Sequence, residues 1–516
     1  MGTLKEDLLA QGMELRETHI SNVFLSESTV FKVKKPVQLG FLDFSTLEAR
    51  KHYCEVEVQL NRRLAEHVYR GVRAITCDAQ GVHCIAEAVG GDEIVDYAVE
   101  MVRLCDRDAA DVQLREGRLS RADLARVAEQ LAAFHAAARC DEETAHFGER
   151  AVIAQNVAEN FEQTRDSAPK FLSAQGIAAI ERWQRDFLDR EHARFEARLA
   201  AQRIRDGHGD LRLEHCYLAD DGSVQIIDCI EFNERFRYGD VCADVAFLAM
   251  DLSWHERPDL SECFLASYAR ASGDYDLYSV VDFYESYRAY VRGKVASLLA
   301  EDETAEESAR ERARSTARKY YQLAEACSRE PLAKPRLYAV GGIIASGKST
   351  LASQLAELID APVLEADRTR KQLAGLDPHT PWRDAAFSGH YGAEQTHAVY
   401  AELLRRAEVI LRSGRSVIID ASFRERAQRA AARARADGLG CEFTFVECVA
   451  PLEVCRQRLA KRAQGPSTSD GRADIFDDFV RSYEPVTELA IAQHVRIDSS
   501  AAAEQVSAQL RTLTDQ

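Results

Sequence analysis

The pattern of apolar and polar positions divides the chain into three stretches. Residues 19–105 alternate short apolar runs with polar turns, which predicts strands, and residues 46–65 form one charged segment with helical spacing. From about residue 120 to 330, apolar residues recur every three or four positions, which predicts helices over 120–139, 151–165 and 175–203. Residues 336–516 alternate apolar runs with helical stretches, as in a parallel sheet flanked by helices.

Charge and proline mark a boundary between the second and third stretches. Residues 301–330 are dense in glutamate and arginine at helical spacing, which predicts a solvated helix that could bridge two domains. Pro331 and Pro335 then interrupt the chain. We therefore expect two domains, residues 1–330 and 336–516, each long enough to bury its own core.

Composition narrows the class of protein. The 84 acidic and 66 basic residues give a formal charge of −18, which disfavours a nucleic-acid-binding surface held by bulk electrostatics. The 13 cysteines are scattered without a C-x-x-C pair, as expected for reduced thiols in the cytoplasm. No run approaches the roughly 20 apolar residues that would span a membrane. We expect a soluble cytoplasmic protein without a membrane partner.

One motif at the start of the third stretch predicts a phosphate-binding loop. Residues 342–350 read Gly-Ile-Ile-Ala-Ser-Gly-Lys-Ser-Thr, which fits G-x-x-x-x-G-K-[ST], between an apolar run at 336–340 and a helical pattern. The glycines let backbone N–H groups face phosphates at a helix N-terminus. Lys348 would reach the β- and γ-phosphates, and the Ser349 hydroxyl would ligate Mg²⁺. The predicted nucleotide-binding residues are Gly342, Ser346, Gly347, Lys348, Ser349 and Thr350.

A carboxylate at the end of a predicted strand supports metal binding in the same domain. Residues 416–420 form an apolar run that ends in Asp420, so a buried strand would deliver this carboxylate to its C-terminal end, where it could hold Mg²⁺. Ala421 stands where a hydrolytic motor would need a glutamate, which favours a kinase. Arg456, Arg458 and Arg462 cluster on a later helix, and from spacing alone a solvated basic face is an equal interpretation.

The first domain contains its own candidate carboxylates. Asp210 follows a His-Gly turn, and Asp228 ends a buried strand 18 residues later. One could act as a base or orient a hydroxyl while the other holds Mg²⁺, or both could merely cap turns. Lys32 and Lys34 share one face of a strand, and Glu55 or Glu57 on the next helix could pair with them. The alternative is an ordinary solvated surface.

These residues resemble the catalytic region of aminoglycoside phosphotransferases and related protein-kinase-like enzymes over roughly residues 15–300. The resemblance implies a bilobal fold, with Asp210 as catalytic base and Asp228 on Mg²⁺. It also implies Lys32 (or Lys34) paired to Glu57 (or Glu55) over the α- and β-phosphates. One position departs from the family, because His215 stands where an asparagine ligates a second Mg²⁺. An imidazole matches Mg²⁺ less well than an amide oxygen, although Glu231 could supply an oxygen.

The second domain resembles the P-loop kinases grouped with polynucleotide kinases, zeta toxins and gluconate kinases, broadly described as AAA family ATPases. In that group, a carboxylate at the position of Asp367 is the base for the acceptor hydroxyl, and an arginine at the position of Arg370 holds phosphate or acceptor. The resemblance also implies that Arg458 and Arg462 are lid arginines and that Ser469-Asp470 is a lid feature.

Together these features predict a mixed α/β and α+β chain, a kinase-like domain followed by a P-loop domain with a parallel sheet. The predicted function is ATP- and Mg²⁺-dependent transfer of phosphate to a hydroxyl of a small-molecule or nucleotide-like acceptor, with the C-terminal site the more secure. The alternative is a regulatory ATP-binding protein whose N-terminal domain is pseudokinase-like. The sequence identifies neither the acceptor nor the oligomeric state.

Overall fold

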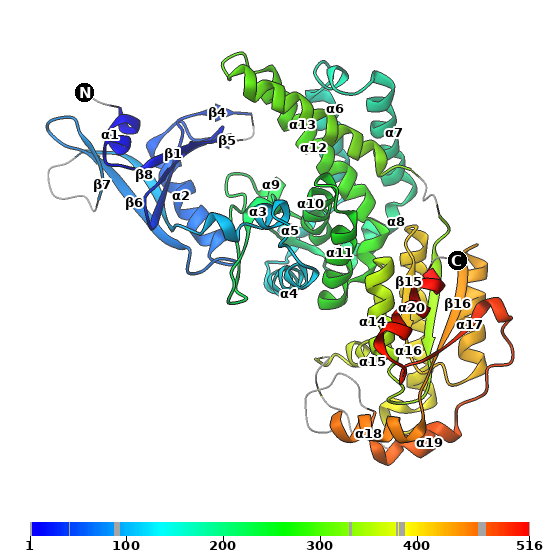
Figure 1. The fold of residues 1–516 in the computed structure, drawn as a ribbon. Coiled ribbons are helices and arrows are strands. Elements are labelled where there is room, and N and C mark those ends of the chain that lie inside the picture. Colours follow the sequence, from blue (N-terminus) through cyan, green and yellow to red (C-terminus); the bar gives the residue numbers. More distant parts are fainter. Residues whose placement is uncertain are drawn as a thin grey trace. The chain divides into compact units, whose positions relative to one another are not determined.

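The computed structural model describes residues 3–40, 42–86, 93–329, 333–377, 380, 387–462 and 471–514, shown as a ribbon in Figure 1. Pro331 and the Ser469-Asp470 pair lie outside these residues. The chain forms two compact units, one of residues 1–261 and 283–327, the other of residues 262–282 and 328–516. Among the described helices, none is long and apolar enough to cross a membrane.

The N-terminal unit begins with a six-stranded antiparallel sheet and one long helix. The strand order is β1-β2-β3-β8-β6-β7, and β2 and β3 pair as an antiparallel hairpin. Helix α2 (Leu47–Asn61) packs Cys54 and Val58 against apolar residues of β6 and β8. The strands are β1 (Glu14–Glu17), β2 (Ser21–Leu25), β3 (Thr29–Lys34), β6 (Tyr69–Cys77), β7 (His83–Ala86) and β8 (Glu93–Val102).

The rest of this unit is mainly helical and is built around α10 (Val241–Trp254), which is buried along nearly its whole length. The periodic stretch 175–203 forms two helices that meet at Glu191, α7 and α8, where a single segment was predicted. The other helices are α1 (Leu4–Ala10), α3 (Ala110–Arg115), α4 (Arg121–Ala137), α5 (Glu142–His146), α6 (Arg150–Gln163), α7 (Ala174–Arg190), α8 (His192–Ala200), α9 (Glu234–Arg237), α12 (Val281–Glu301) and α13 (Glu307–Ala326).

Helix α13 differs from the solvated, domain-bridging helix that its charges predicted. Its charged residues do face solvent, but Ala317, Tyr320 and Tyr321 are buried within the N-terminal unit. Tyr320 stacks on Trp254 of α10, with ring centroids 5.1 Å apart. The apolar stripe of α13 therefore completes this unit, because burial of its aromatic side chains stabilises one face of the helix while the charged face stays in water.

Short strand pairs place the candidate carboxylates of this unit. Strands β9 (Ile204–Asp206) and β12 (Tyr238–Asp240) pair antiparallel, as do β10 (Cys216–Leu218) and β11 (Val224–Ile226). The loop after β9 carries Asp210, and the segment after β11 carries Asp228. A further antiparallel pair, β4 (Gln38–Leu39) and β5 (Leu42–Asp43), lies between β3 and α2 in the chain.

The C-terminal unit is the predicted parallel sheet flanked by helices. Five strands pair in the order β14-β15-β13-β16-β17, all parallel. They are β13 (Arg336–Gly341), β14 (Val363–Glu365), β15 (Val417–Asp420), β16 (Glu442–Val449) and β17 (His494–Asp498). The helices are α14 (Lys348–Ile359), α15 (Ala366–Leu373), α16 (Ala393–Arg412), α17 (Arg426–Gly438), α18 (Leu452–Arg462), α19 (Phe476–Arg481) and α20 (Ala503–Thr514). The mixed fold expected from the sequence is confirmed.

Residues 262–282, which include most of α11 (Pro258–Ser272), belong to this second unit. Arg415, just before β15, donates to the carboxylates of Glu262 at 2.8 Å and Asp282 at 2.9 Å. The guanidinium of Arg406 on α16 lies over the ring of Tyr275 at 5.0 Å. These side chains attach a segment from the middle of the chain to the C-terminal sheet and helices.

Candidate active site

The parallel register of the C-terminal sheet brings the predicted phosphate loop and metal carboxylate together. Val340 at the end of β13 lies opposite Asp420 at the end of β15, and Glu365 of β14 is the next neighbour. Because parallel strands end at one edge of the sheet, the loop after β13 opens beside both carboxylates. Gly342 has a φ of 144°, and a Cβ there would lie 2.3 Å from the Cys448 carbonyl oxygen, so only glycine fits.

The loop holds its lysine and serine over the start of α14. Lys348 Nζ donates to the Ile343 carbonyl oxygen at 2.8 Å, and the Ser349 hydroxyl lies close enough to the Asp420 carboxylate to affect its pKa. Burial raises the pKa of Asp420 to about 6, although the Lys348 ammonium and the Ser349 hydroxyl oppose the rise. Hydroxyl and carboxylate oxygens are donors that suit Mg²⁺, so this pair fits the metal that the sequence predicted.

A cavity of about 160 Å³ joins these groups to the predicted acceptor residues. Asp367 and Arg370 lie on α15 and line it, as does Arg462 at the end of α18. The residues of the predicted site that share this one cavity are Gly347, Lys348, Ser349, Thr350, Asp367, Arg370, Asp420 and Arg462. A phosphate loop, a metal carboxylate and a candidate base therefore face a common space.

Arg458 has different surroundings from those expected of a lid arginine. Its guanidinium donates to the Ser346 carbonyl oxygen at 3.0 Å and to the Ser499 carbonyl oxygen at 2.8 Å. These bonds brace the phosphate loop from the side of β17, and Arg458 is not among the residues that line the cavity. Arg458 and Arg462 lie four residues apart on one helix, and this spacing did not indicate that only Arg462 lines the cavity.

Several aromatic and basic residues that line the cavity were not predicted from the sequence. Arg424 lies over the ring of Phe387 at 4.1 Å, and the Phe387 and Phe479 rings lie 4.9 Å apart. The Arg370 guanidinium lies over the Tyr391 ring at 4.6 Å. The position of Arg424, four residues after Asp420 at the carboxyl end of β15, was the available signal. Phe387 and Phe479 come from loops and a short helix that no motif marks.

In the N-terminal unit, two lysines of β3 share one glutamate of α2. Lys32 Nζ lies 2.8 Å from Glu57 Oε1, and Lys34 Nζ lies 2.7 Å from Glu57 Oε2. Lys32 also donates to Asp228 at 2.6 Å, while Lys34 also pairs with Glu231. Glu55, the other candidate partner, is exposed near Lys51. Both lysines are therefore paired internally rather than forming a solvated surface.

The turn before Asp210 is fixed by a buried carboxylate. Asp244 of α10 accepts hydrogen bonds from the backbone N–H groups of His208 at 2.6 Å and Gly209 at 2.8 Å. A Cβ on Gly207 would lie 2.4 Å from Asp244 Oδ2, which explains the glycine at that position. The loop that presents Asp210 is thus anchored to the most buried helix of the unit.

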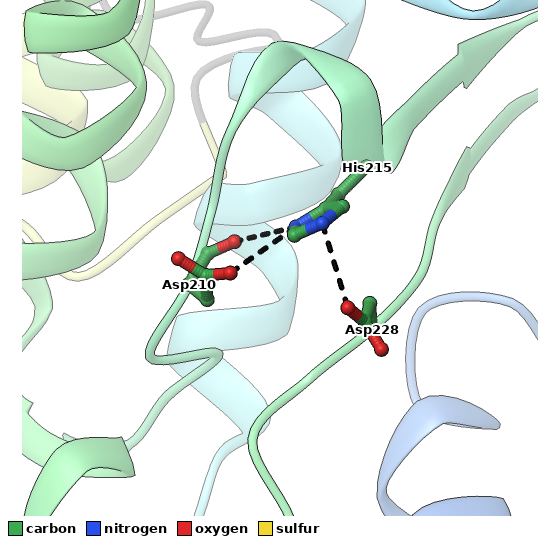
Figure 2. Close-up of side chains that lie close together, drawn as sticks. All are labelled: Asp210, His215 and Asp228. Atoms are coloured by element: carbon green, nitrogen blue, oxygen red, sulfur yellow. Dashed lines mark hydrogen bonds and ion pairs between the residues drawn. The ribbon is translucent and has the colours of Figure 1, made fainter. Parts of the chain in front are cut away.

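Figure 2 shows Asp210, His215 and Asp228 facing one another. One candidate ligand atom from each lies within 4.8 Å of the other two. Arg212 holds the Asp210 carboxylate with two hydrogen bonds, Nε to Oδ1 at 3.1 Å and Nη2 to Oδ2 at 2.9 Å. Asp228 has a φ of 67°, uncommon outside glycine. The structure brings the three predicted residues together. However, the Arg212 guanidinium is hydrogen-bonded to both carboxylate oxygens of Asp210, the expected base.

Comparison with known proteins identifies two domains. Residues 53–284 match the model of the phosphotransferase enzyme family, and residues 337–486 match that of an AAA domain. The uncharacterized protein Rv2004c of Mycobacterium tuberculosis is 36% identical to this chain over 463 residues. The matched residues make up 90% of this chain and 88% of that protein. Two solved structures are similar to parts of this chain. One is a choline/ethanolamine kinase family protein from Mesorhizobium loti, with 11% identity and a TM-score of 0.36, covering 61% of this chain and 92% of that one. The other is a sugar kinase from Janibacter sp. HTCC2649, with 21% identity and a TM-score of 0.27, covering 35% of this chain and 95% of that one.

Proposed function

Because the chain belongs to the family of this mycobacterial relative and carries a phosphotransferase-family domain before an AAA domain, we propose that it is an ATP- and Mg²⁺-dependent kinase. The two domains indicate phosphotransferase activity. The finer proposal is transfer of the γ-phosphoryl group to a hydroxyl of a small-molecule or nucleotide-like acceptor in the C-terminal unit. The observation that carries it is the shared cavity of Lys348, Asp420 and Asp367.

Each of these residues has a distinct task in the proposed reaction. Lys348 and the backbone N–H groups of the loop hold the phosphates, and Asp367 accepts the proton of the acceptor hydroxyl. Ser349 and Asp420 would hold Mg²⁺, which when bound neutralises charge on the phosphate oxygens. Arg370 and Arg462 face the same cavity, where a guanidinium stabilises the charge of the transferred group.

The proposal is tested by an unbiased screen for phosphate acceptors. The full chain is incubated with γ-labelled ATP, Mg²⁺ and fractionated cell metabolites, and labelled products are identified by mass spectrometry. A kinase should label a defined product that the Lys348→Ala chain does not produce. Label that appears only in inorganic phosphate, with every fraction, would contradict the assignment of a dedicated acceptor.

Lys348→Ala is expected to weaken ATP binding at the C-terminal site by about 10- to 100-fold, the effect of losing one charge-assisted hydrogen bond to phosphate. The fold should be unaffected, because the partly exposed Lys348 side chain lies at the start of α14 and not in the apolar core. Calorimetric titration of the full chain with ATP measures the change. Lys334→Ala, at an exposed lysine of the same unit, is the matched control. Unchanged affinity in the folded Lys348 variant would refute the phosphate-loop assignment.

ATP binding in the presence of Mg²⁺ is expected to weaken as the pH falls from 7 to 5. Asp420 must be ionised to hold a metal ion, and its pKa of about 6 means that it takes up a proton over this range. That pKa is above the value of an unfolded aspartate, so protonation of Asp420 stabilises the folded chain and the loss would not reflect unfolding. Titrations at several pH values measure the change. Asp420→Asn should bind more weakly at pH 7 and lose this pH dependence; an identical pH profile would exclude Asp420 as its source.

The second candidate function is regulatory ATP binding, and one observation favours it for the N-terminal unit. The Asp210 carboxylate is held on both oxygens by Arg212, which leaves it a poorer proton acceptor than an unpaired base. Under this hypothesis the N-terminal unit binds ATP without transferring phosphate. The discriminating measurement is product formation by the Asp367→Asn chain once an acceptor is known. Residual transfer that is then lost with Asp210→Asn would identify the N-terminal unit as a second kinase.

A further inference from the structure

Helix α15, which carries Asp367 and Arg370, has little intrinsic means of holding its position. It is eight residues long and follows β14, a three-residue strand at one edge of the parallel sheet. Isolated helices of this length are unstable in water, and an edge strand is paired on one side only. The placement of Asp367 in the cavity therefore depends on what packs against β14 and α15.

Arg270 of α11 holds the residue that immediately precedes α15. Its Nε donates to Glu365 Oε2 at 3.2 Å and its Nη2 donates to Oε1 at 3.0 Å, while Arg368 Nε donates to Oε2 at 2.9 Å. Glu365 occupies the N-cap position of α15, yet within the described chain its side chain makes no capping hydrogen bond. Two arginines, and not the helix backbone, therefore fix this carboxylate, which is 20% exposed.

Two further contacts from the same segment reach the strand and the far end of the helix. Tyr275 is 2% exposed, and its hydroxyl donates to the Val363 carbonyl oxygen of β14 at 3.4 Å. Gly273 lies against the last turn of α15, where a Cβ would be 2.9 Å from Gln372 Nε2. Residues 270–275 therefore contact the strand before α15 and both ends of the helix.

Glu365 lines the cavity, whereas Arg270 is not among the described residues that line it. We propose that Arg270 is a positioning residue for phosphoryl transfer in the C-terminal unit: by holding Glu365 it fixes the first turn of α15, where Asp367 lies. Arg270 falls within the match to the phosphotransferase family, residues 53–284, so a segment matched to one family completes the site of the other. This inference rests on the function proposed for the C-terminal unit.

The first test needs no acceptor and follows hydrogen exchange of the full chain by mass spectrometry. Arg270→Met removes the charge and both hydrogen bonds, so the amides of α15 should exchange about two- to fivefold faster, the effect of losing one partly exposed ion pair. Arg270→Lys should recover part of the loss, and α14 amides and ATP affinity should not change. Asp276→Asn is the matched control, because it breaks an exposed pair between the same segment and Arg405 of α16.

A double variant shows whether Arg270 acts through Glu365. In a Glu365→Gln background, Arg270→Met should add little to the exchange of α15, because the ion pair is already lost. An α15 exchange rate in Arg270→Met no higher than in Asp276→Asn would overturn the proposal. So would an Arg270→Met effect that persists undiminished in the Glu365→Gln background.

The second test measures phosphate transfer with the acceptor that the screen identifies. Arg270→Met should lower kcat about three- to tenfold and leave the KM for ATP unchanged, because it displaces the helix of Asp367 and not the phosphate loop. Arg270→Lys should restore part of kcat. A parental kcat in Arg270→Met would overturn the role of Arg270, whereas a parent chain that labels no acceptor would contradict the proposed kinase.

Discussion

Replacing Asp367 with asparagine is expected to slow phosphoryl transfer by about 10²–10⁴-fold, the usual contribution of a general base. ATP affinity should stay near that of the parent, because Asp367 lies in the first turn of α15 and not in the phosphate loop. Asparagine keeps the size and most of the hydrogen bonding of the side chain but cannot accept the proton of a hydroxyl. The measurement is the initial rate of labelled phosphate transfer at saturating ATP, once the screen provides an acceptor.

Two control variants distinguish a role of Asp367 as general base from a general effect of removing a negative charge. Asp437→Asn removes one negative charge from an exposed position of the same unit and should leave the rate unchanged. Arg370→Ala should lower transfer through weaker acceptor binding or weaker stabilisation of transition-state charge, again with little change in ATP affinity. If Asp367→Asn transfers phosphate at the parental rate, the proton acceptor lies elsewhere, and Asp367 serves only to shape the cavity.

The parts of the site that the sequence predicted are those whose geometry is local or set by strand order. Residues 342–350 form a loop between a strand and a helix, and each role follows from position within that loop. Asp420 could be placed because parallel strands that flank one another end at the same edge of the sheet. Both predictions follow from the elements that directly flank these residues in the chain.

The parts that could not be predicted depend on contacts between distant segments. Phe387 precedes α16 and Phe479 lies in α19, more than 90 residues later, so their rings meet only in the folded chain. Residues 262–282 join the C-terminal unit through Arg415, which lies more than 130 residues later in the chain. The periodicity of either segment predicts a buried face but not which partner covers it.

Lys34 illustrates the same limit at the level of one ion pair. The alternation of β3 shows that Lys32 and Lys34 share a face, but not that one lysine is partly accessible and the other fully buried. Lys34 has no exposed side-chain surface, and its ammonium contacts Glu57 and Glu231. Burial alone would lower the pKa of Lys34, but these carboxylates outweigh it and raise that pKa above its usual value.

Lys34→Met is therefore expected to destabilise the N-terminal unit by about 3–5 kcal/mol, the cost of leaving a buried charge without its partner. The variant keeps the length of the side chain but leaves Glu231 without its lysine. Because such a carboxyl has a raised pKa, the loss should be largest at neutral pH and shrink as the pH falls toward 5. Urea unfolding of the full chain measures the stability, and hydrogen exchange of the β3 and α2 amides localises the change.

Two further variants decide whether the expected loss comes from the charge. Lys35→Met alters the neighbouring, partly exposed lysine, which bonds to the Thr18 carbonyl oxygen, and should cost less than about 1 kcal/mol. Adding Glu231→Gln to Lys34→Met removes the unpaired carboxylate and should recover much of the stability at neutral pH, because a neutral amide costs less to bury than an ion. If the double variant is no more stable than Lys34→Met, the packing of the lysine stem, and not its charge, holds β3 against α2.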